Sequence, residues 1–475
     1  MPSTTVSQLV GLIQQSVMAL EKLCLENRTS LPDLDAFHFD QSSETFRSLP
    51  GAAQDAKIAV AACMQLIAIL SPPTDTVYRA ALGGHLSFAT RTCLEANITE
   101  ILREAGPEGL HINDIASKCG LDPSKLGRVI RYLVIHHIYR EVKPDVFTNN
   151  RTSSTMDTGK PLDKLISEPD RKYDDTGFPA LISHFMDVDQ KCGAVGWDVL
   201  KDPVLGHSCD LTETIFSRAF NTKSKYWDFF DHPENHYMRR RFDYAMKGLG
   251  AIEDHDMVLH AFSWEDLDKG SVIVDVGGGI GTAMLPLARR YPNFDIVIQD
   301  LPIVIEEGTK FWSQNLPDAV ANGNIKLHAH NFFDEQPIKN ASVFYLRHVL
   351  HDWPMPDMVK ILQRLRDVAA ANTTLIILDY ILPYSCKMFA DKDAVSIASA
   401  RYYSEAPEPL LPNYGAVSHG PYTMDLTMMF HYNSQEHTYL SLKSLLDASG
   451  WRLVRLRAID PRNDYFQSIE CKILA

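Results

Sequence analysis

The chain has 475 residues, long enough for two or three domains, and 45% of them are hydrophobic and 22% charged. This composition is ordinary for a folded globular protein and excludes a disordered or collagen-like chain. Lys and Arg number 46 against 60 Asp and Glu, a net charge of −14. Such a surface repels phosphate backbones and anionic lipid, so we expect neither a nucleic-acid nor a membrane partner. The longest apolar run, residues 58–70, falls short of the about 20 residues that a membrane span needs.

The eight cysteines form no closely spaced pair, and the N-terminus lacks the basic-then-apolar pattern of a secretory signal. We therefore expect reduced thiols and a cytoplasmic location. The nearest approach to a metal motif is His328 and His330, which have no partner thiols nearby, so we predict no metal site.

The first 80 residues predict two helices. Apolar residues recur at helical spacing over residues 4–26, and a second apolar helix is expected over residues 53–70, ending before a Ser-Pro-Pro sequence. The turn-rich residues 28–50 between them predict a loop.

Residues 109–149 predict a helix, a turn, a second helix and a hairpin, which is the order of a winged-helix unit. Asp122 is expected to cap the second helix and Pro123 to occupy its first position. That helix carries the basic residues Lys125, Arg128 and Arg131. They could form a DNA-binding face or the solvated face of a scaffold or dimerisation module, and the net charge favours the second interpretation.

Residues 151–268 read as mostly helical and are dense in aromatic residues, which can build a core, an apolar substrate wall, or both. From residue 271 short apolar strands alternate with helices, the pattern of an α/β, doubly wound parallel sheet. We expect strands at 271–276, 296–299, 325–328, 343–346 and 375–378, helices at 282–290, 303–314 and 356–371, and a terminal strand pair at 451–456 and 466–471.

A glycine-rich loop follows the first of these strands. Residues 275–281 read Asp-Val-Gly-Gly-Gly-Ile-Gly, so glycines recur in a G-x-G-x-G spacing at Gly277, Gly279 and Gly281. A dinucleotide-binding fingerprint, G-x-G-x-x-G, would need glycine at position 282, which is Thr282. Glycines at the end of a strand let the backbone approach a ligand closely, although a purely structural tight turn has the same composition.

An acidic residue ends the second strand, nineteen residues after the loop. Asp300 there could accept both hydroxyls of a ribose, or it could cap the turn before Leu301-Pro302. Together the loop and this carboxylate suggest an adenosyl ligand at the carboxyl ends of the strands.

The motifs in this half of the chain resemble a known family. Residues 274–281 are similar to the S-adenosylmethionine loop of plant and fungal small-molecule O-methyltransferases. Family-like motifs follow in the family's order at residues 299–302 (Gln-Asp-Leu-Pro), 351–353 (His-Asp-Trp), 378–383 (Leu-Asp-Tyr-Ile-Leu-Pro) and 435–438 (Gln-Glu-His-Thr). The resemblance covers residues 85–475 and implies a Rossmann-like methyltransferase sheet, S-adenosylmethionine as cofactor and a homodimer formed through the winged-helix domain.

The resemblance also implies a domain organisation. We expect a helical extension at 1–80, a winged-helix-like dimerisation domain at 81–160, a helical connecting and substrate region at 161–268 and the S-adenosylmethionine-binding catalytic domain at 269–475. Residues 384–421 are longer than in the plant relatives and rich in proline, which predicts a loop that is either a lid or interface or a surface excursion.

In the family that this sequence resembles, the base is the histidine of the His-Asp-Trp motif. That histidine corresponds to His351 here. An unperturbed imidazole titrates near 6.5 and can take a hydroxyl proton near neutrality, although a lone histidine is often structural. The family's two flanking glutamates correspond to Asp379 and Glu436. Asp379 is one methylene shorter, so we expect it to orient His351 less directly or through water; it could also simply end a strand, and Glu436 could be a solvated residue before the helix at 438–448.

The cofactor residues carry over less completely. The resemblance assigns Gly277, Gly279 and Asp300 to S-adenosylmethionine, with Asn331 in place of an acid near the adenine amine. Phe332 is expected on the adenine face, and Arg347 stands where the family commonly has lysine.

The expected function is methyl transfer from S-adenosylmethionine to a hydroxyl of an aromatic or polyketide-like small molecule in fungal secondary metabolism. An alternative on the same fold is a pericyclase or dehydratase that binds the cofactor without transferring methyl, and a third is a DNA-binding regulator. Met246, Met428 and Met429 fall near the family's substrate region, but methionine at helical positions is more often a core residue, so we do not assign them to the site.

Overall fold

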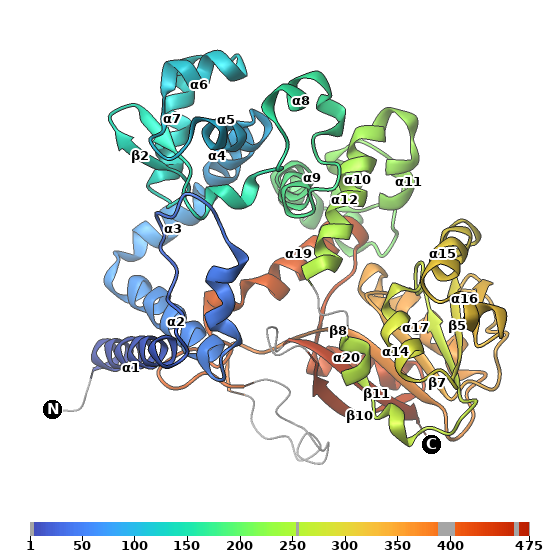
Figure 1. Ribbon diagram of the computed structural model, residues 1–475. Helices are drawn as coiled ribbons and strands as arrows, with labels where there is room; N and C mark the ends of the chain where they lie inside the picture. Colours follow the sequence, from blue (N-terminus) through green and yellow to red (C-terminus); the bar gives the residue numbers. More distant parts are fainter. Residues whose placement is uncertain (1–3, 253–255, 388–403, 460–464, 475) are drawn as a thin grey trace.

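The computed structural model describes residues 4–252, 256–387, 404–459 and 465–474. Helices from the first 250 residues fill the upper and left parts of Figure 1, and the sheet with its covering helices lies at the lower right. Helix α19 (His419–Tyr432) comes from late in the chain but lies between these two parts.

The N-terminal region contains the two expected helices, α1 (Thr5–Glu26) and α2 (Ala52–Leu70), whose small and apolar residues pack together. The Thr4 hydroxyl accepts a hydrogen bond from the Ser7 amide and so fixes where α1 begins. The segment between the helices is not loop throughout, because the 3-10 helix η1 (Gln41–Ser48) forms there. Asp40 caps η1 through the Ser42 amide, a local bond that our loop prediction overlooked.

Helix α2 is long and apolar enough, by length and composition, to cross a membrane, whereas the sequence predicted a run too short to do so. The difference arises because the helix begins at Ala52 and is 19 residues long, with Gln54, Asp55 and Lys57 preceding the apolar run of residues 58–70. Only 22% of its most apolar window is buried. The buried part packs with α1 and with a late segment, in a cluster of Leu9, Ala61, Ala62, Leu410 and Tyr414.

The winged-helix order is confirmed by α6 (Ile112–Cys119), α7 (Pro123–Val134) and a hairpin of β2 (Arg140–Lys143) and β3 (Val146–Thr148). A short strand, β1 (Leu110–His111), completes a three-stranded sheet in the order β1-β3-β2. Asp122 caps α7 as predicted, accepting from the Lys125 amide at 2.9 Å.

The connecting region is helical and aromatic, as expected. Its helices are α8 (Leu162–Ser167), α9 (Phe178–Leu200), α10 (Ile215–Ala219), α11 (Tyr226–Asp231), α12 (His236–Ile252) and α13 (Met257–Ala261). Phe216, Tyr226, Phe230 and Phe242 form a buried cluster here. Met428 and Tyr432 of α19 join the same cluster, so this late helix is packed into the aromatic wall.

The sheet has the predicted doubly wound form, with order β10-β11-β8-β7-β4-β5-β6 and a short β9 beside β8. Strands β4 (Val272–Val276), β5 (Asp295–Asp300), β6 (Ile325–Ala329), β7 (Val343–Arg347) and β8 (Thr374–Leu382) run parallel. Strands β10 (Trp451–Ala458) and β11 (Phe466–Ile473) form the expected antiparallel terminal pair. The parallel strands bring their carboxyl ends, and the loops that follow them, to one edge.

Further helices and one short strand cover the sheet or connect it to the N-terminal helical region. They include α3 (Pro73–Ala81), α4 (Gly83–Glu95), α5 (Ile98–Ala105), η7 (Thr282–Met284), α14 (Leu285–Arg290), α15 (Pro302–Asn315), α16 (Pro317–Ala321), η8 (Leu350–Asp352), α17 (Met355–Arg366), η9 (Gly415–Ser418), β9 (His437–Thr438) and α20 (Tyr439–Ala448). The long 384–421 segment ends in η9 and the start of α19, and its residues 388–403 lie outside the described residues.

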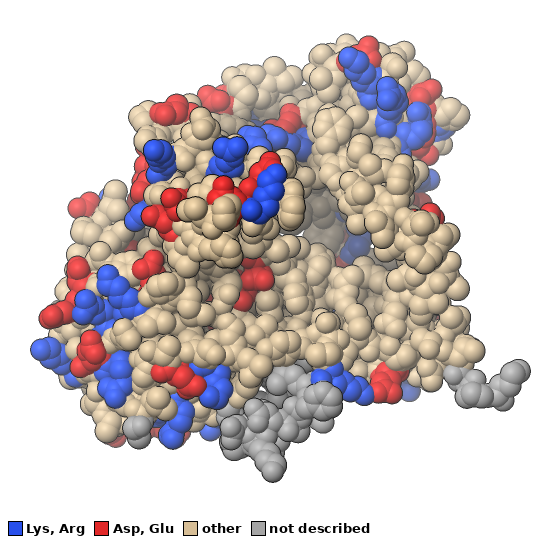
Figure 2. All heavy atoms as spheres, turned by 180° about the vertical axis from the view of Figure 1, so that it is seen from behind, with Lys and Arg blue, Asp and Glu red and all other residues tan. Residues whose placement is uncertain are grey.

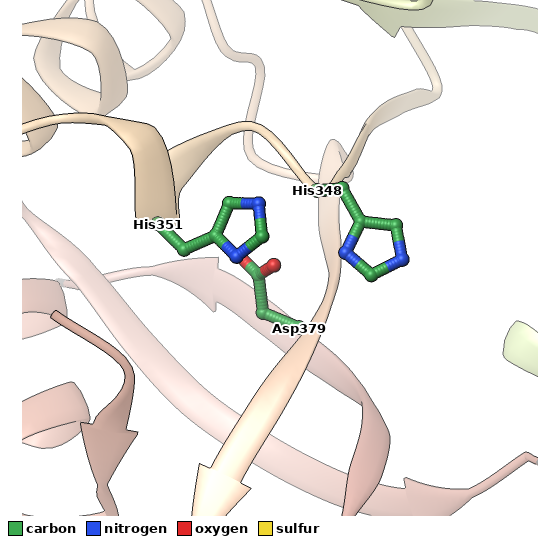
Figure 3. Close-up of side chains that lie close together, drawn as sticks. All are labelled: His348, His351 and Asp379. Carbon is green, nitrogen blue, oxygen red and sulfur yellow. The ribbon is translucent and has the colours of Figure 1, made fainter. Parts of the chain in front are cut away.

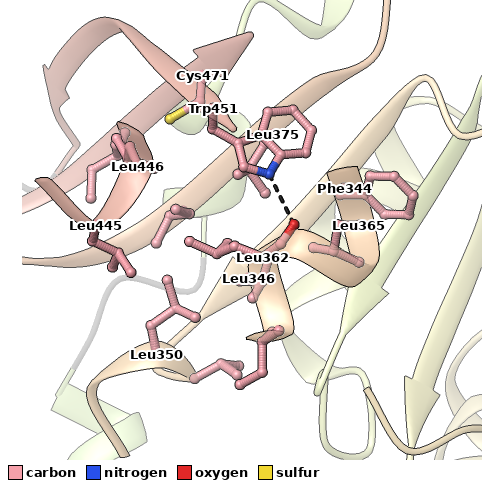
Figure 4. Close-up of a cluster of buried hydrophobic side chains, with 14 of the residues drawn as sticks. Phe344, Leu346, Leu350, Leu362, Leu365, Leu375, Leu445, Leu446, Trp451 and Cys471 are labelled. Atoms are coloured by element: carbon pink, nitrogen blue, oxygen red, sulfur yellow. Dashed lines mark hydrogen bonds between the residues drawn. The ribbon is translucent and has the colours of Figure 1, made fainter. Parts of the chain in front are cut away.

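A buried apolar cluster holds α17 and α20 against the sheet (Figure 4). At its centre the fully buried Trp451 donates a hydrogen bond from Nε1 to the Leu362 carbonyl at 3.0 Å, which satisfies its one polar atom. Leu350 belongs to the same cluster, so the segment next to it in η8 is anchored to the core.

Candidate active site

The predicted cofactor residues lie at the carboxyl edge of the sheet, on four different strands. The glycine loop follows β4, Asp300 ends β5, Asn331 and Phe332 follow β6, and Arg347 ends β7. Parallel pairing of β4 with β5 and β7, and of β5 with β6, therefore gathers residues that are up to 70 positions apart in sequence.

The glycine loop is shaped so that side chains would block it. Gly277 has φ 66°, and a Cβ there would lie 3.1 Å from the Val349 side chain and 3.3 Å from that of Phe332. Gly279 has φ 61° and donates its amide to Asp300 Oδ2 at 2.8 Å. The structure thus brings Phe332 and Asp300 directly to the loop and leaves a backbone-lined cradle.

A carboxylate lies buried beneath the loop. Burial raises the pKa of Asp275 to about 7, an effect that the positive charge of Arg347 opposes. Among the described residues, Asp275 Oδ2 has no hydrogen-bond partner. A buried polar atom of this kind costs free energy unless a ligand supplies the missing bond. The cradle and this atom fit an adenosyl ligand with an amino group, and Asp275 is a site candidate that sequence reasoning did not single out.

Asp300 and Asn331 are placed differently from each other. Burial raises the pKa of Asp300, while its bonds to the Leu301 and Gly279 amides oppose the rise. Asn331 is exposed, and its Oδ1 accepts from the Phe333 amide at 3.1 Å. The Asn331 side chain therefore stabilises its own turn and is less closely tied to the cradle than Asp300 is.

His351 and Glu436 form a direct, buried hydrogen bond. His351 Nδ1 lies 2.8 Å from Glu436 Oε1, and the Glu436 side chain is only 1% exposed. The Glu436 amide donates to Asp425 Oδ1, which fixes the approach of the acidic residue. The interpretation of Glu436 as a solvated helix-terminal residue is therefore wrong, because the fold turns it inward onto the imidazole.

Asp379 lies within β8, opposite Gln467 of β11, rather than at a strand end. Its carboxylate and one ring nitrogen each of His348 and His351 lie within 4.8 Å of one another (Figure 3), a grouping that could also hold a metal ion. Burial raises the pKa of Asp379 to about 8, and Oδ1 has no hydrogen-bond partner among the described residues. At neutral pH Asp379 is therefore a largely protonated group beside His351.

The charges around His351 set its protonation. Burial alone would lower the pKa of His351, but the carboxylates of Glu436 and Asp352 outweigh burial and raise it to about 10. Asp352 Oδ1 lies 3.8 Å from Nε2, and burial raises the Asp352 pKa to about 6. In the free protein His351 is therefore an imidazolium held by its carboxylates.

His348 was not predicted from the sequence. It has φ 52°, a strained region for a residue with a side chain, and it stacks on Phe466 with ring centroids 4.7 Å apart. Its position directly after Arg347, at a strand end, was the signal available in the sequence.

A cavity of about 330 Å³ opens beside His351. It is lined by His184, Phe185, Tyr226, Trp227, Phe242, Met246, Gly250, Arg347, His348, His351, Asp352, Tyr380, Met424, Thr427, Met428, His431 and Tyr432. The aromatic connecting region therefore supplies both core and cavity wall, and Met246 and Met428 line the cavity whereas Met429 only packs against the cluster.

Known proteins match the chain over its whole length. A family described as an O-methyltransferase domain matches residues 197–402. The 4-O-methyltransferase 1 of Phanerochaete chrysosporium is 42% identical over 472 residues, 99% of each chain. The chain belongs to the O-methyltransferase family. The 3-O-methyltransferase 2 of the same fungus is 31% identical, with 94% of each chain covered.

Solved structures confirm the fold of this O-methyltransferase. The mitomycin 7-O-methyltransferase MmcR has a TM-score of 0.59 at 19% identity, covering 84% of this chain and 98% of its own. LepI in complex with SAM has a TM-score of 0.60 at 18% identity, covering 91% and 100%. The cofactor of this enzyme is S-adenosylmethionine, and its substrate is a small molecule.

Gly277→Ala tests the cradle. The substitution adds a methyl group 3.1 Å from Val349 and forces alanine into left-handed backbone, so we expect affinity for S-adenosylhomocysteine, measured by calorimetry, to fall at least about tenfold. Gly323→Ala is the control, because Gly323 has φ 78° with open space around it. It carries the same backbone strain but should leave affinity unchanged, and equal losses in both variants would contradict a cradle at Gly277.

Proposed function

We propose that this enzyme transfers a methyl group to a hydroxyl of an aromatic or polyketide-like small molecule, with His351 as the general base. The observation that carries the proposal is the 2.8 Å bond from His351 to buried Glu436 at the wall of an apolar cavity. Glu436 holds one ring nitrogen and leaves Nε2 for the acceptor hydroxyl. That is the arrangement expected of an oriented base.

The cavity supports an aromatic acceptor. Its wall is built mainly of aromatic and methionine side chains, which bind a flat apolar ring, and about 330 Å³ suits a small ring system. Tyr226 and Trp227 of α11 and Met428 of α19 are part of this wall. Polar groups also line the cavity, at His351 and Asp352 and on α19 at Thr427 and His431.

We assign the cofactor to Gly277, Gly279, Asp300, Phe332 and Arg347, with Asn331 at the rim of the site. When bound, S-adenosylmethionine supplies an activated methyl group and a positive charge at this edge of the sheet. The chain's own work is to hold the acceptor in line and to take its proton. Asp275 is an additional candidate, since its unpartnered oxygen could accept from an amino group.

Proton transfer at His351 follows from its charged surroundings. The imidazolium of the free enzyme must first lose a proton before Nε2 can accept one from a hydroxyl. A His351 pKa near that of a phenol, about 10, makes the transfer between the two nearly balanced in free energy. Asp379, largely protonated, adds no further negative charge next to the ring.

Names of relatives narrow the setting. The most similar relatives described above are fungal, and their names specify transfer to a 4-O and a 3-O position. We propose the same reaction type here, on a ring hydroxyl, within fungal secondary metabolism. Free cysteines at all eight positions suit the reducing conditions of the cytoplasm, where we place the enzyme.

A pericyclase or dehydratase remains the alternative reaction, since one solved neighbour is described as a pericyclic reaction enzyme at 18% identity and TM-score 0.57. A base held by Glu436 favours methyl transfer over a pericyclic ring closure, because that ring closure needs no proton acceptor. Incubation with cofactor labelled in its methyl group separates the two: label in the product supports transfer, and turnover without cofactor consumption supports the alternative.

The side chains of the winged-helix unit disfavour a DNA-binding regulator, because basic groups of this unit lie beside acidic ones. Arg131 of α7 is paired with Glu141 and Asp145, at 2.8 and 2.7 Å. Basic side chains of this unit, at the upper right of Figure 2, have acidic ones beside them. We propose instead that the domains divide as the resemblance implies, with residues 81–160 in dimerisation.

We also propose that the apolar face of α2 pairs with a second copy of this chain. Val60, Met64 and Ile67 recur at helical spacing on that face and are exposed, as are Val77 and Tyr78 of α3. No charged residue occurs between positions 58 and 74. The face is continuous in sequence with the winged-helix domain, so both can contribute to one homodimer interface.

His351→Ala should lower turnover by about 10²–10⁴, the usual contribution of a positioned base. Cofactor affinity should change little, because the cradle does not include His351. Higher pH should partly rescue the variant on a phenolic acceptor, since solvent can then remove the proton. Cofactor titration beside single-turnover rates checks this, and a near-normal rate would reject the base assignment.

Glu436→Gln should shift the pH dependence in a defined direction. The carboxylate raises the His351 pKa, so removing its charge lowers that pKa and moves the rising limb of kcat/KM to lower pH by about one unit or more. The plateau rate should fall less than in His351→Ala, because the base remains. Rate profiles at saturating cofactor measure the shift; an unmoved limb, or one moved to higher pH, would contradict the role of Glu436.

Met64→Lys combined with Ile67→Lys should convert a dimer to a monomer, since two ammonium groups would have to be desolvated at the interface. Sedimentation velocity at micromolar concentration gives the readout. Ile303→Lys on α15, another exposed apolar position, is the matched control and should leave the dimer intact. A monomeric wild type, or a doubly substituted dimer, would refute this interface.

A further inference from the structure

A second imidazole is fixed in the wall of the cavity, apart from His351. His431 of α19 is 3% exposed, and its Nε2 lies 2.9 Å from Asp189 Oδ1 of α9. Thr427, one turn earlier on α19, donates its hydroxyl to the other oxygen, Oδ2, at 2.7 Å. One carboxylate thus holds two cavity-lining side chains of α19.

The ring of His431 is also fixed by aromatic contacts. It stacks on Tyr226 with centroids 4.3 Å apart and planes 17° apart. The Tyr226 hydroxyl is itself hydrogen-bonded to His184 Nε2 at 2.8 Å, and burial keeps the His184 pKa well below its usual value. Phe216 meets the His431 ring edge-on at 6.0 Å. Little freedom of rotation is left to the ring.

This arrangement fixes which ring nitrogen carries the proton. A carboxylate only accepts hydrogen bonds, so Nε2 donates to Asp189, and Nδ1 of the neutral ring keeps a lone pair. Within the described parts of the chain, no side chain or backbone group is hydrogen-bonded to Nδ1. His431 and His351 line the same cavity.

We propose that Nδ1 of His431 accepts a hydrogen bond from a second hydroxyl of the acceptor, so that the enzyme selects aromatic substrates with two hydroxyls. The inference rests on the proposed methyl transfer. One hydroxyl lies at His351 and is methylated, while the other is bound at His431 and orients the ring. Asp189 is a positioning residue, since it acts through His431.

A simpler interpretation is that Asp189 only braces α9 against α19. That brace accounts for the bonds to Nε2 and Thr427, but a leucine or phenylalanine would fill the apolar wall without presenting a nitrogen lone pair. A site built to pair a hydroxyl discriminates against an analogue without it, because the buried acceptor is then left unpaired. A single neutral pair of this kind corresponds to about ten- to hundredfold in kcat/KM.

The probes are matched acceptors: phenol against the three benzenediols, and 2-naphthol against naphthalenediol isomers that place the second hydroxyl at different distances. We expect at least one diol to exceed its mono-ol about ten- to hundredfold in kcat/KM, after halving where its two hydroxyls are equivalent. Mono-ols within threefold of every diol would overturn the inference while leaving methyl transfer intact. No methylation of any of these compounds would contradict the proposed aromatic acceptor, and this inference with it.

Three variants separate recognition from bracing. His431→Gln can keep a donor near the Nε2 position for Asp189 but removes the acceptor at Nδ1, so the diol preference should fall to near one. His431→Asn places an amide near Nδ1 and should retain part of the preference. Thr427→Val breaks the brace and leaves Nδ1 in place, so the preference should stay.

A purely structural role predicts a different result. All three variants would then slow the mono-ol and the diol equally, with the ratio between them unchanged, and that outcome would overturn the inference. Circular dichroism and S-adenosylhomocysteine affinity check that each variant folds. If one variant does not fold, the ratio of kcat/KM for diol over mono-ol in the wild type still tests the inference.

Discussion

The hydrogen bond between His351 and Glu436 is the interaction around which the site is built, and several distant elements must pack together to form it. It joins residues 85 positions apart, one on η8 after β7 and one just before β9. Placing it requires the parallel pairing of β7 with β8 and of β8 with β9, and the anchoring of Leu350 in the core. A buried carboxylate is costly unless it is paired, so the imidazole and Glu436 stabilise each other's burial.

The protonation of the groups around this bond depends on their burial and on the carboxyl groups close to His351. Three carboxyl groups, of Glu436, Asp352 and Asp379, surround one imidazole in a buried space. Burial raises the pKa of Asp379 to about 8, and the negative charges of Glu436 and Asp352 add to that rise. The same two carboxylates raise the pKa of His351 to about 10 against the effect of burial. At neutral pH this leaves Asp379 as a largely protonated acid near His351, while Glu436 is in a direct hydrogen bond with the ring.

The helical part of the chain contributes the other half of the site. Helix α19 carries the cavity residues Met428 and His431 into the aromatic cluster of α9, α10 and α11, and Asp189 fixes it there. The cavity beside His351 is therefore built between elements from early and late parts of the sequence. Its polar groups come from both parts, whereas the predicted cofactor residues lie at the sheet edge.

The sequence alone determined the parts that depend on local patterns. The fold, the cofactor and the reaction class were predicted from the alternating strands and helices, the Asp122 cap, the glycine loop and the family motifs. These patterns depend only on residues that are close together in the sequence. Residues 28–50 show the limit of local patterns, because η1, capped by Asp40, forms where the sequence predicted a loop.

Only the tertiary structure decided how distant side chains meet. His348, Asp189 and His431 lie outside the motifs, and strand order and helix packing bring them to the cavity or to the groups that line it. Asp275 belongs to the glycine-loop motif, but only the fold buries it beneath the loop. Burial likewise exists only in the folded chain, and it turned Glu436 from a possible solvated residue into a partner of His351. Sequence specifies which groups are available, but pKa values and hydrogen bonds depend on distances and solvent exclusion that only packing creates.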